Sequence, residues 1–182
     1  MSNGEGMKTA VFGGGCFWCT EAVFQDLRGV RSVLPGYSGG TVPSPTYQQV
    51  CSETTGHAEV IEVQYEPKEV DYNDLLSVFF ATHDPTTVDR QGNDVGSQYR
   101  SVIFYQDEEQ RKEAEQAIEK LETEGTFGAP IVTQLEPLDV FYEAEGYHRN
   151  YFRNNPGQAY CSVIIAPKVA KFRQKNMDKL RG

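Results

Sequence analysis

Short runs of apolar residues, some alternating with polar ones, divide the chain into predicted strands and helices. Strands are predicted at 8–12, 30–34, 57–65, 99–105, 131–135, 140–142 and 160–166. A spacing of three to four residues between apolar positions predicts helices at 18–27, 71–83 and 107–124, and a basic surface helix from Lys168 onward. Helices and strands therefore alternate along the whole chain.

The boundaries of these elements have chemical signals of their own. Asp71 and Asp107 precede two of the helices and are suited to cap them, and Gly29 and Gly125 end helices. The order of elements predicts an α+β fold, a single-domain two-layer sandwich with helices covering a mixed, mostly antiparallel sheet. We expect one domain over 8–182 and a flexible tail over 1–7.

Composition narrows the function classes. The 182 residues have a net charge of −9, which argues against a general nucleic-acid or anionic-membrane binder. No apolar run approaches the length of a membrane span, and the first residues lack the apolar core of a signal peptide. We expect a cytoplasmic monomer, in which four cysteines are thiols or redox groups rather than structural disulfides.

Cys16 is the most informative residue. It follows three glycines at a strand-to-helix turn, where the positive end of the helix dipole favours a thiolate. Phe17 and Trp18 beside it are suited to wall an apolar pocket. This pattern predicts a nucleophile with a binding site, and the alternative is a buried cysteine in a tight loop.

Glu59 is the second candidate. In the strand at 57–65 the odd positions are mostly apolar, so a period of two places Glu59 on the core-facing side. Burial without a charged partner favours the protonated carboxyl, which is a suitable general acid near neutral pH. The alternative is a solvated carboxylate at the strand end.

Four further polar residues are candidates for the same site. Tyr47 and Tyr99 lie near loops, where a phenol can donate to a substrate oxygen, although a half-buried core tyrosine is the simpler interpretation. Asp94 precedes a glycine-containing turn and is suited to hold a tyrosine or a water, or to form an Asx-turn. His57 is one strand step from Glu59 on the same face and is expected to help shape the site.

The remaining cysteines leave alternatives open. Cys19 forms a C-x-x-C pair with Cys16, which supports a reversible disulfide, but it also shares an apolar helix face. Cys161 alternates with Val163 and Ile165 on a predicted strand face, and Cys51 lies in a polar loop. A single C-x-x-C without a second ligand pair disfavours a zinc site.

Together these segments resemble the A-type peptide-methionine (S)-S-oxide reductases. The resemblance is carried by GCFWCTE at 15–21, GYSGG at 36–40, PTY at 45–47, TGHAE at 55–59 and DVGSQYRS at 94–101. It spans about residues 8 to 166. It implies a ferredoxin-like α/β plait and repair of one epimer of methionine sulfoxide, without a metal or organic cofactor.

The resemblance also implies a role for each matching residue. Cys16 would attack the sulfoxide sulfur and become a sulfenic acid, while Glu59 would protonate the oxygen. The other roles are hydrogen bonds to that oxygen from Tyr47 and Tyr99, support of the polar network by Asp94, and contact with the S-methyl group by Phe17 and Trp18. A second thiol would then form a disulfide that thioredoxin reduces.

The C-terminal part departs from the family pattern. Many members carry their recycling cysteines on a flexible, glycine-rich tail, whereas here Cys161 enters the apolar run 162–166. Cys161 is the aligned resolving residue, Cys19 is the alternative, and an external thiol is a third route. Two rival functions are a general thiol-disulfide oxidoreductase using Cys16 and Cys19, and a thiol-based redox sensor.

Overall fold

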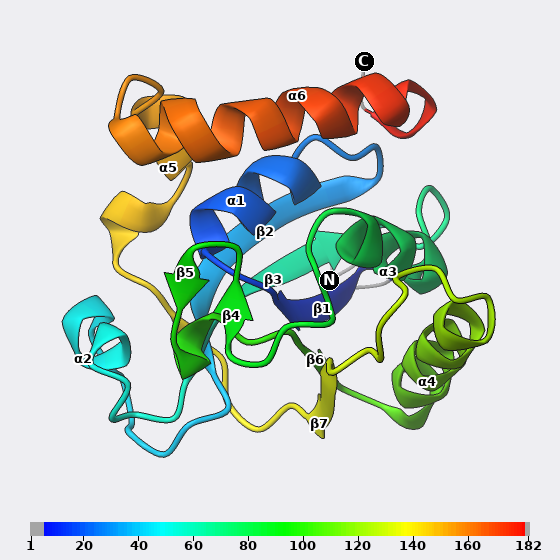
Figure 1. The fold of residues 1–182 in the computed structure, drawn as a ribbon, viewed down its shortest axis with the longest axis horizontal. Coiled ribbons are helices and arrows are strands. Elements are labelled where there is room, and N and C mark those ends of the chain that lie inside the picture. Colours follow the sequence, from blue (N-terminus) through cyan, green and yellow to red (C-terminus); the bar gives the residue numbers. More distant parts are fainter. Residues whose placement is uncertain (1–5, 181–182) are drawn as a thin grey trace.

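A computed structural model describes residues 6–180, and its centre is one six-stranded mixed sheet (Figure 1). The strand order is β7-β6-β1-β3-β2-β8, and every pairing is antiparallel except the parallel pair β6–β7. The strands are β1 (Lys8–Gly13), β2 (Val30–Ser38), β3 (Ala58–Tyr65), β6 (Val102–Tyr105), β7 (Gln134–Pro137) and β8 (Tyr142–Glu143). A separate hairpin pairs β4 (Arg90–Gln91) with β5 (Asp94–Val95).

The helices complete the two-layer α+β sandwich that the sequence predicts. They are α1 (Phe17–Phe24), α2 (Tyr47–Cys51), α3 (Tyr72–Ala81), α4 (Glu108–Thr123), α5 (Tyr151–Asn154) and α6 (Ala166–Lys175). Short helical turns lie at Ser97–Tyr99, Gly146–His148, Cys161–Ile165 and Met177–Lys179. Asp71 and Asp107 cap α3 and α4 through their side chains, as predicted.

The main core lies between the sheet and the helices. Ile61 and Val63 of β3 point into it, together with Phe12 of β1 and Phe79 of α3. The alternate residues of β3 form a smaller cluster on the opposite face, where Leu138 and Phe141 cover it. Strand periodicity therefore sorted β3 correctly. Glu59 alternates in step with Ile61 and Val63, so its side chain lies on the helix-covered face of the sheet.

The predicted strand at 160–166 is wrong. The segment is a π-helical turn over Cys161–Ile165 that continues into α6, and it packs beside α1 (Figure 1). Its β-branched residues favour a strand, but buried positions recur at Cys161, Ile165, Val169 and Phe172, which is a helical spacing. Pro167 lacks an N–H, so it cannot donate the backbone hydrogen bond of a regular α-helix. The wider π-helical turn lies directly before this proline.

Other boundaries shift by a few residues. β2 continues to Ser38 through the expected loop at 35–40, because Gly36 and Tyr37 pair with Val60 and Glu59 of β3. The first seven residues, predicted as a tail, lie mostly outside the described residues, which begin at Gly6. Within the described chain, no helix has both the length and the apolar content needed to cross a membrane.

Candidate active site

The turn between β1 and α1 positions Cys16. Cys16 is the N-cap residue of α1, and the helix begins at Phe17. Gly13 lets β1 approach β3 closely, since a Cβ there would lie 2.9 Å from the Glu59 carbonyl oxygen. Gly15 has a φ of +87°, a left-handed conformation that favours glycine. The glycine run thus brings the thiol and the β3 carboxyl into one site.

The Cys16 thiol is neutral in the resting protein. Only 8% of the residue is exposed, and burial raises its pKa well above the usual value, with the charges of Glu59 and Cys19 adding to the effect. The sequence-based expectation of a favoured thiolate is therefore wrong. Loss of solvation, the largest cause, outweighs the helix dipole at the start of α1.

Glu59 is held at the edge of the same turn. Its Oε1 accepts a hydrogen bond of 3.0 Å from the Phe17 backbone N–H, while its buried Oε2 has no hydrogen-bond partner among the described residues. Burial raises the pKa of this carboxyl to about 8. The prediction that Glu59 is buried is confirmed, the raised pKa favours its protonated form, and one oxygen has no partner among the described residues.

Aromatic rings form the apolar part of the site. Phe17 is fully buried between Tyr37, Tyr47 and His148, so its ring packs beneath the site and exposes no surface for the methyl contact that the resemblance implies. Trp18 is only partly buried and stacks on Tyr151, with ring centroids 3.8 Å apart. The exposed part of the Trp18 ring is the surface available to an apolar group.

His148 is a site residue that sequence reasoning missed. Its Nδ1 accepts a 2.9 Å hydrogen bond from the Trp18 Nε1–H, and burial lowers its pKa, so the ring is neutral. Glu145, three residues earlier, accepts from the Tyr37 hydroxyl and the Tyr47 backbone N–H, each at 2.8 Å. No spacing in the sequence linked this C-terminal segment to the GCFWC turn.

Tyr47 and Tyr99 both lie within electrostatic reach of Glu59. Burial raises the pKa of each phenol, and the next largest cause in both is the negative charge of Glu59. The backbone carbonyl of Tyr99 accepts a 3.1 Å hydrogen bond from the Gly15 N–H, which ties its loop to the cysteine turn. Both tyrosines therefore remain protonated donors beside the carboxyl.

Asp94 does hold a tyrosine, although the sequence did not indicate which one. Its Oδ2 accepts a 2.5 Å hydrogen bond from the Tyr160 hydroxyl. Burial raises the pKa of Tyr160, and the charges of Cys16 and Cys19 add to it, so this ring lies beside both thiols. Tyr160 also meets the edge of Trp18, with centroids 6.1 Å apart.

His57 is placed differently from its predicted role. Its Nδ1 accepts a 3.0 Å hydrogen bond from the Gly40 N–H, and its Nε2 lies 2.7 Å from the Val42 carbonyl oxygen. Both ring nitrogens are thus engaged by the loop after β2. The ring also contacts Tyr142 of β8 edge-on, so its described contacts support that loop.

The other cysteines lie at different depths. Cys19 and Cys161 are buried free thiols, while Cys51 is partly exposed. Lys168 and the Tyr160 hydroxyl lower the pKa of Cys19 against the larger effect of burial, and the charge of Cys161 raises it. Cys19 is therefore within electrostatic reach of both Cys16 and Cys161.

Glu21 is a second residue that the sequence did not single out. Its carboxyl is buried inside α1, and its Oε2 accepts a 2.8 Å hydrogen bond from the backbone N–H of Asn150, a residue with a φ of +54°. This bond joins α1 to the segment that carries His148 and Tyr151. Burial raises the pKa of Glu21 to about 7.

The raised pKa of Glu21 predicts a pH-dependent stability. The folded protein favours the neutral carboxyl, so this contribution is complete below the unfolded pKa near 4.5 and is lost as pH rises through about 7. We expect the melting temperature of Glu21→Gln to fall less than that of the unmodified protein between pH 5 and 8. The exposed helix residue Glu119 gives the matched control, Glu119→Gln. If the melting temperatures of all three proteins changed equally between pH 5 and 8, the raised pKa of Glu21 would be contradicted.

Comparisons with known proteins agree with this geometry. A family model described as peptide methionine sulfoxide reductase matches residues 8–181. Peptide methionine sulfoxide reductase MsrA of Deinococcus radiodurans is 58% identical over 178 residues, which cover 98% of this chain and 86% of that protein. The protein of that name from Saccharolobus solfataricus is 53% identical, with 96% and 98% covered.

Solved structures show the same likeness. Mxr1 from Saccharomyces cerevisiae in reduced form has a TM-score of 0.79 and 34% identity, covering 87% of this chain and 91% of that chain. Mxr1 in complex with Trx2 has a TM-score of 0.57 and 25% identity, covering 81% and 86%. The fold resemblance thus extends to a family structure solved with a partner.

Proposed function

The chain belongs to the peptide methionine sulfoxide reductase family, and we propose that it reduces the S epimer of methionine sulfoxide, free or in proteins, through a Cys16 sulfenic acid. One observation carries this mechanism. A buried thiol lies at the turn before α1, and the Phe17 N–H of that helix start holds a buried carboxyl of β3 with an unpartnered oxygen, beside a partly exposed tryptophan ring. A sulfoxide needs these three things: a nucleophile for sulfur, a proton for oxygen and an apolar surface for its methyl group.

Glu59 prepares both reacting groups. Below about pH 8 its carboxyl holds a proton, and Oε2 is free to donate it to the sulfoxide oxygen. The negative charge of Glu59 is one cause of the raised pKa of Cys16, so a protonated Glu59 also makes Cys16 easier to ionise. Tyr47 and Tyr99 would donate further hydrogen bonds to the same oxygen, and Asp94 would fix Tyr160 beside the thiol.

The first half-reaction balances without a cofactor. The Cys16 sulfur attacks the sulfoxide sulfur, the sulfur–oxygen bond of the substrate breaks, and the oxygen is transferred to Cys16. Methionine sulfoxide and a thiol thus become methionine and a sulfenic acid. The substrate sulfur gains two electrons and Cys16 loses two.

The second half-reaction restores the thiol. We propose that Cys161 attacks the Cys16 sulfenic acid, which forms a disulfide and releases water, and that thioredoxin reduces this disulfide. Cys161 begins the helical segment beside α1 and interacts with Cys19, so it belongs to the same thiol cluster. Cys161 is buried, so this step requires the turn over Cys161–Ile165 to move.

Single-turnover reduction of the two resolved sulfoxide epimers by prereduced protein tests the proposal. We expect conversion of the S epimer alone, with loss of two thiols and a Cys16–Cys161 bridge in the mass spectrum. A Cys16–Cys19 bridge would keep the reaction and reassign the resolving residue. Absence of conversion with either epimer would refute the reductase mechanism and favour a redox sensor.

A further inference from the structure

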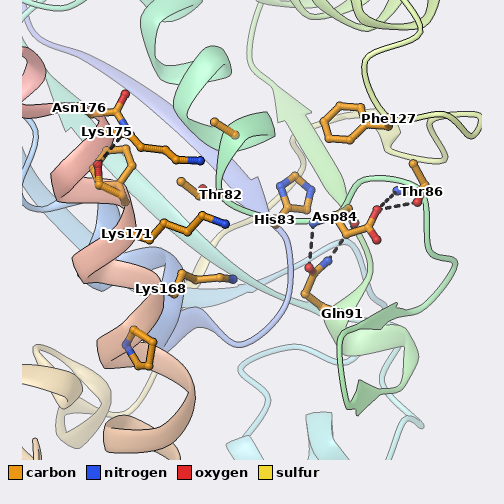
Figure 2. A pocket seen from close by; sticks show the side chains of 13 residues that line it. Thr82, His83, Asp84, Thr86, Gln91, Phe127, Lys168, Lys171, Lys175 and Asn176 are labelled. Atoms are coloured by element: carbon orange, nitrogen blue, oxygen red, sulfur yellow. Dashed lines mark hydrogen bonds between the residues drawn. The ribbon is translucent and has the colours of Figure 1, made fainter.

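A pocket of about 710 Å³ lies between α6 and the chain that follows α3 (Figure 2). Its α6 wall carries Lys168, Lys171 and Lys175, whose spacing of three and four residues places them on one helix face. Figure 2 shows the three ammonium groups extending from α6 toward Thr82 and His83. The pocket is distinct from the group of side chains around Glu59.

The three lysines have no anionic partner within residues 6–180. None of the ion pairs between described residues includes them, whereas Arg173 on the same helix pairs with Asp26 at 2.9 Å. Unpaired cations gathered on one face provide a favourable site for an anionic group. Arg173 thus anchors α6 to Asp26, whereas the lysines are available to bind an anionic group.

The opposite wall does little to neutralise this charge. Asp84 is the one carboxylate among the described residues lining the pocket, and it accepts hydrogen bonds from the backbone N–H and hydroxyl of Thr86. His83 uses both ring nitrogens, with the Phe79 carbonyl and the Ser101 hydroxyl, and burial lowers its pKa to about 4. Three lysines and one aspartate leave +2 at pH 7 (3 − 1), in a chain of −9.

The pocket adjoins the thiol cluster. Lys168 lowers the pKa of Cys19, which places its charge near that thiol, and Cys19 also interacts with Cys161. Cys161 opens the helical segment that continues directly into α6. A partner bound over the lysines would therefore lie against the segment that must move when Cys161 reacts.

We propose that Lys168, Lys171 and Lys175 form a docking surface for the acidic face of the protein dithiol that reduces the Cys16–Cys161 disulfide. This inference rests on the proposed function, because it assigns a surface to its last step. The local positive charge would offset repulsion between an acidic reductant and the net negative chain, and so raise the association rate.

The redox step that follows docking is balanced. One thiolate of the reductant attacks the disulfide, forms a mixed disulfide and releases one cysteine of this protein as a thiol. The second thiol of the reductant then displaces the other cysteine. The reductant leaves as a disulfide, and two electrons and two protons restore both cysteines.

Charge reversal on α6 tests the docking surface. The double variant Lys171→Glu with Lys175→Glu is compared with Lys112→Glu with Lys120→Glu, which reverses two exposed charges on α4. The rate is measured at saturating sulfoxide with a thioredoxin of negative net charge, and separately with uncharged dithiothreitol. We expect the α6 variant alone to lose about 10-fold or more in kcat/KM for thioredoxin, with a weaker salt dependence.

The dithiothreitol rate separates this proposal from the function on which it rests. It should stay unchanged in both double variants, because neither touches the site around Cys16. Equal kcat/KM for thioredoxin in both variants would overturn the docking surface, as would an equal loss with dithiothreitol. Inorganic phosphate that binds the pocket without inhibiting the thioredoxin reaction would also overturn it. Lack of sulfoxide turnover by the unmodified protein with either reductant would refute the proposed function, and the docking proposal with it.

Discussion

Replacing Cys16 with serine is expected to abolish reduction of methionine sulfoxide, lowering kcat/KM by about 10⁴-fold or more. The hydroxyl of serine is a far weaker nucleophile toward sulfur than a thiol, because it is much less acidic and less polarisable. The serine and cysteine side chains are nearly the same size, so the packing of α1 and the Gly15 turn should be preserved. The change therefore removes the reacting atom and little else.

The measurement is methionine formed from the S epimer, with dithiothreitol as reductant so that recycling is not limiting. Cys51→Ser is the matched control, because Cys51 is a partly exposed thiol on α2 with no chemical role in the mechanism, and a serine hydroxyl keeps a hydrogen-bonding group beside Tyr47. Dimedone should label a sulfenic acid in the control and not in Cys16→Ser. Turnover by Cys16→Ser at more than a few per cent of the control rate would transfer the nucleophilic role to another cysteine.

The sequence alone specified much of the catalytic turn. Three glycines followed by Cys16 and an apolar helix predicted the strand–turn–helix that the structure contains. Period two placed Glu59 on the buried face of β3, and the antiparallel pairing of β1 with β3 then brings it beside the turn. The face on which Glu59 lies can be predicted from one strand alone, whereas the pairing of β1 with β3 depends on the whole sheet.

Long-range partners were not readable in the same way. His148 and Tyr151 complete the surroundings of Trp18 from more than 120 residues further along the chain, through contacts that no local period encodes. The protonation state of Cys16 was predicted wrongly for a related reason. A dipole argument uses only the local helix, while the pKa of the thiol depends on burial by distant segments and on Glu59.

The segment after Tyr160 shows how tertiary packing overrides local propensity. Ser162 to Ile165 has the composition of a strand, yet Val163 and Ile164 are exposed while Cys161 and Ile165 are buried. A helical period was present in the buried set, but it spans the proline at 167 that normally argues against a helix interior. The π turn before Pro167 lets the helix continue through a residue that cannot donate a backbone hydrogen bond.

Replacing Glu59 with glutamine is expected to preserve the fold and lower sulfoxide turnover by about 10²- to 10⁴-fold, the usual contribution of a general acid. Glutamine keeps an oxygen that can accept from the Phe17 N–H, so the anchor of the side chain remains. It cannot transfer a proton to the sulfoxide oxygen. Tyr47→Phe is the companion variant, since it removes one proposed hydrogen bond to that oxygen and leaves the acid in place.

The pH profile distinguishes a proton donor from a structural carboxyl. The pKa of Glu59 is about 8, so the acid is present below that pH, and kcat/KM of the unmodified protein should fall as pH rises through it. Ionised Glu59 also holds the pKa of Cys16 higher, which acts in the same direction. In Glu59→Gln both effects disappear, so the residual rate should rise with pH as Cys16 ionises. A variant that is slow but keeps the alkaline decline would show that another group donates the proton, because no titration at position 59 would remain to cause it.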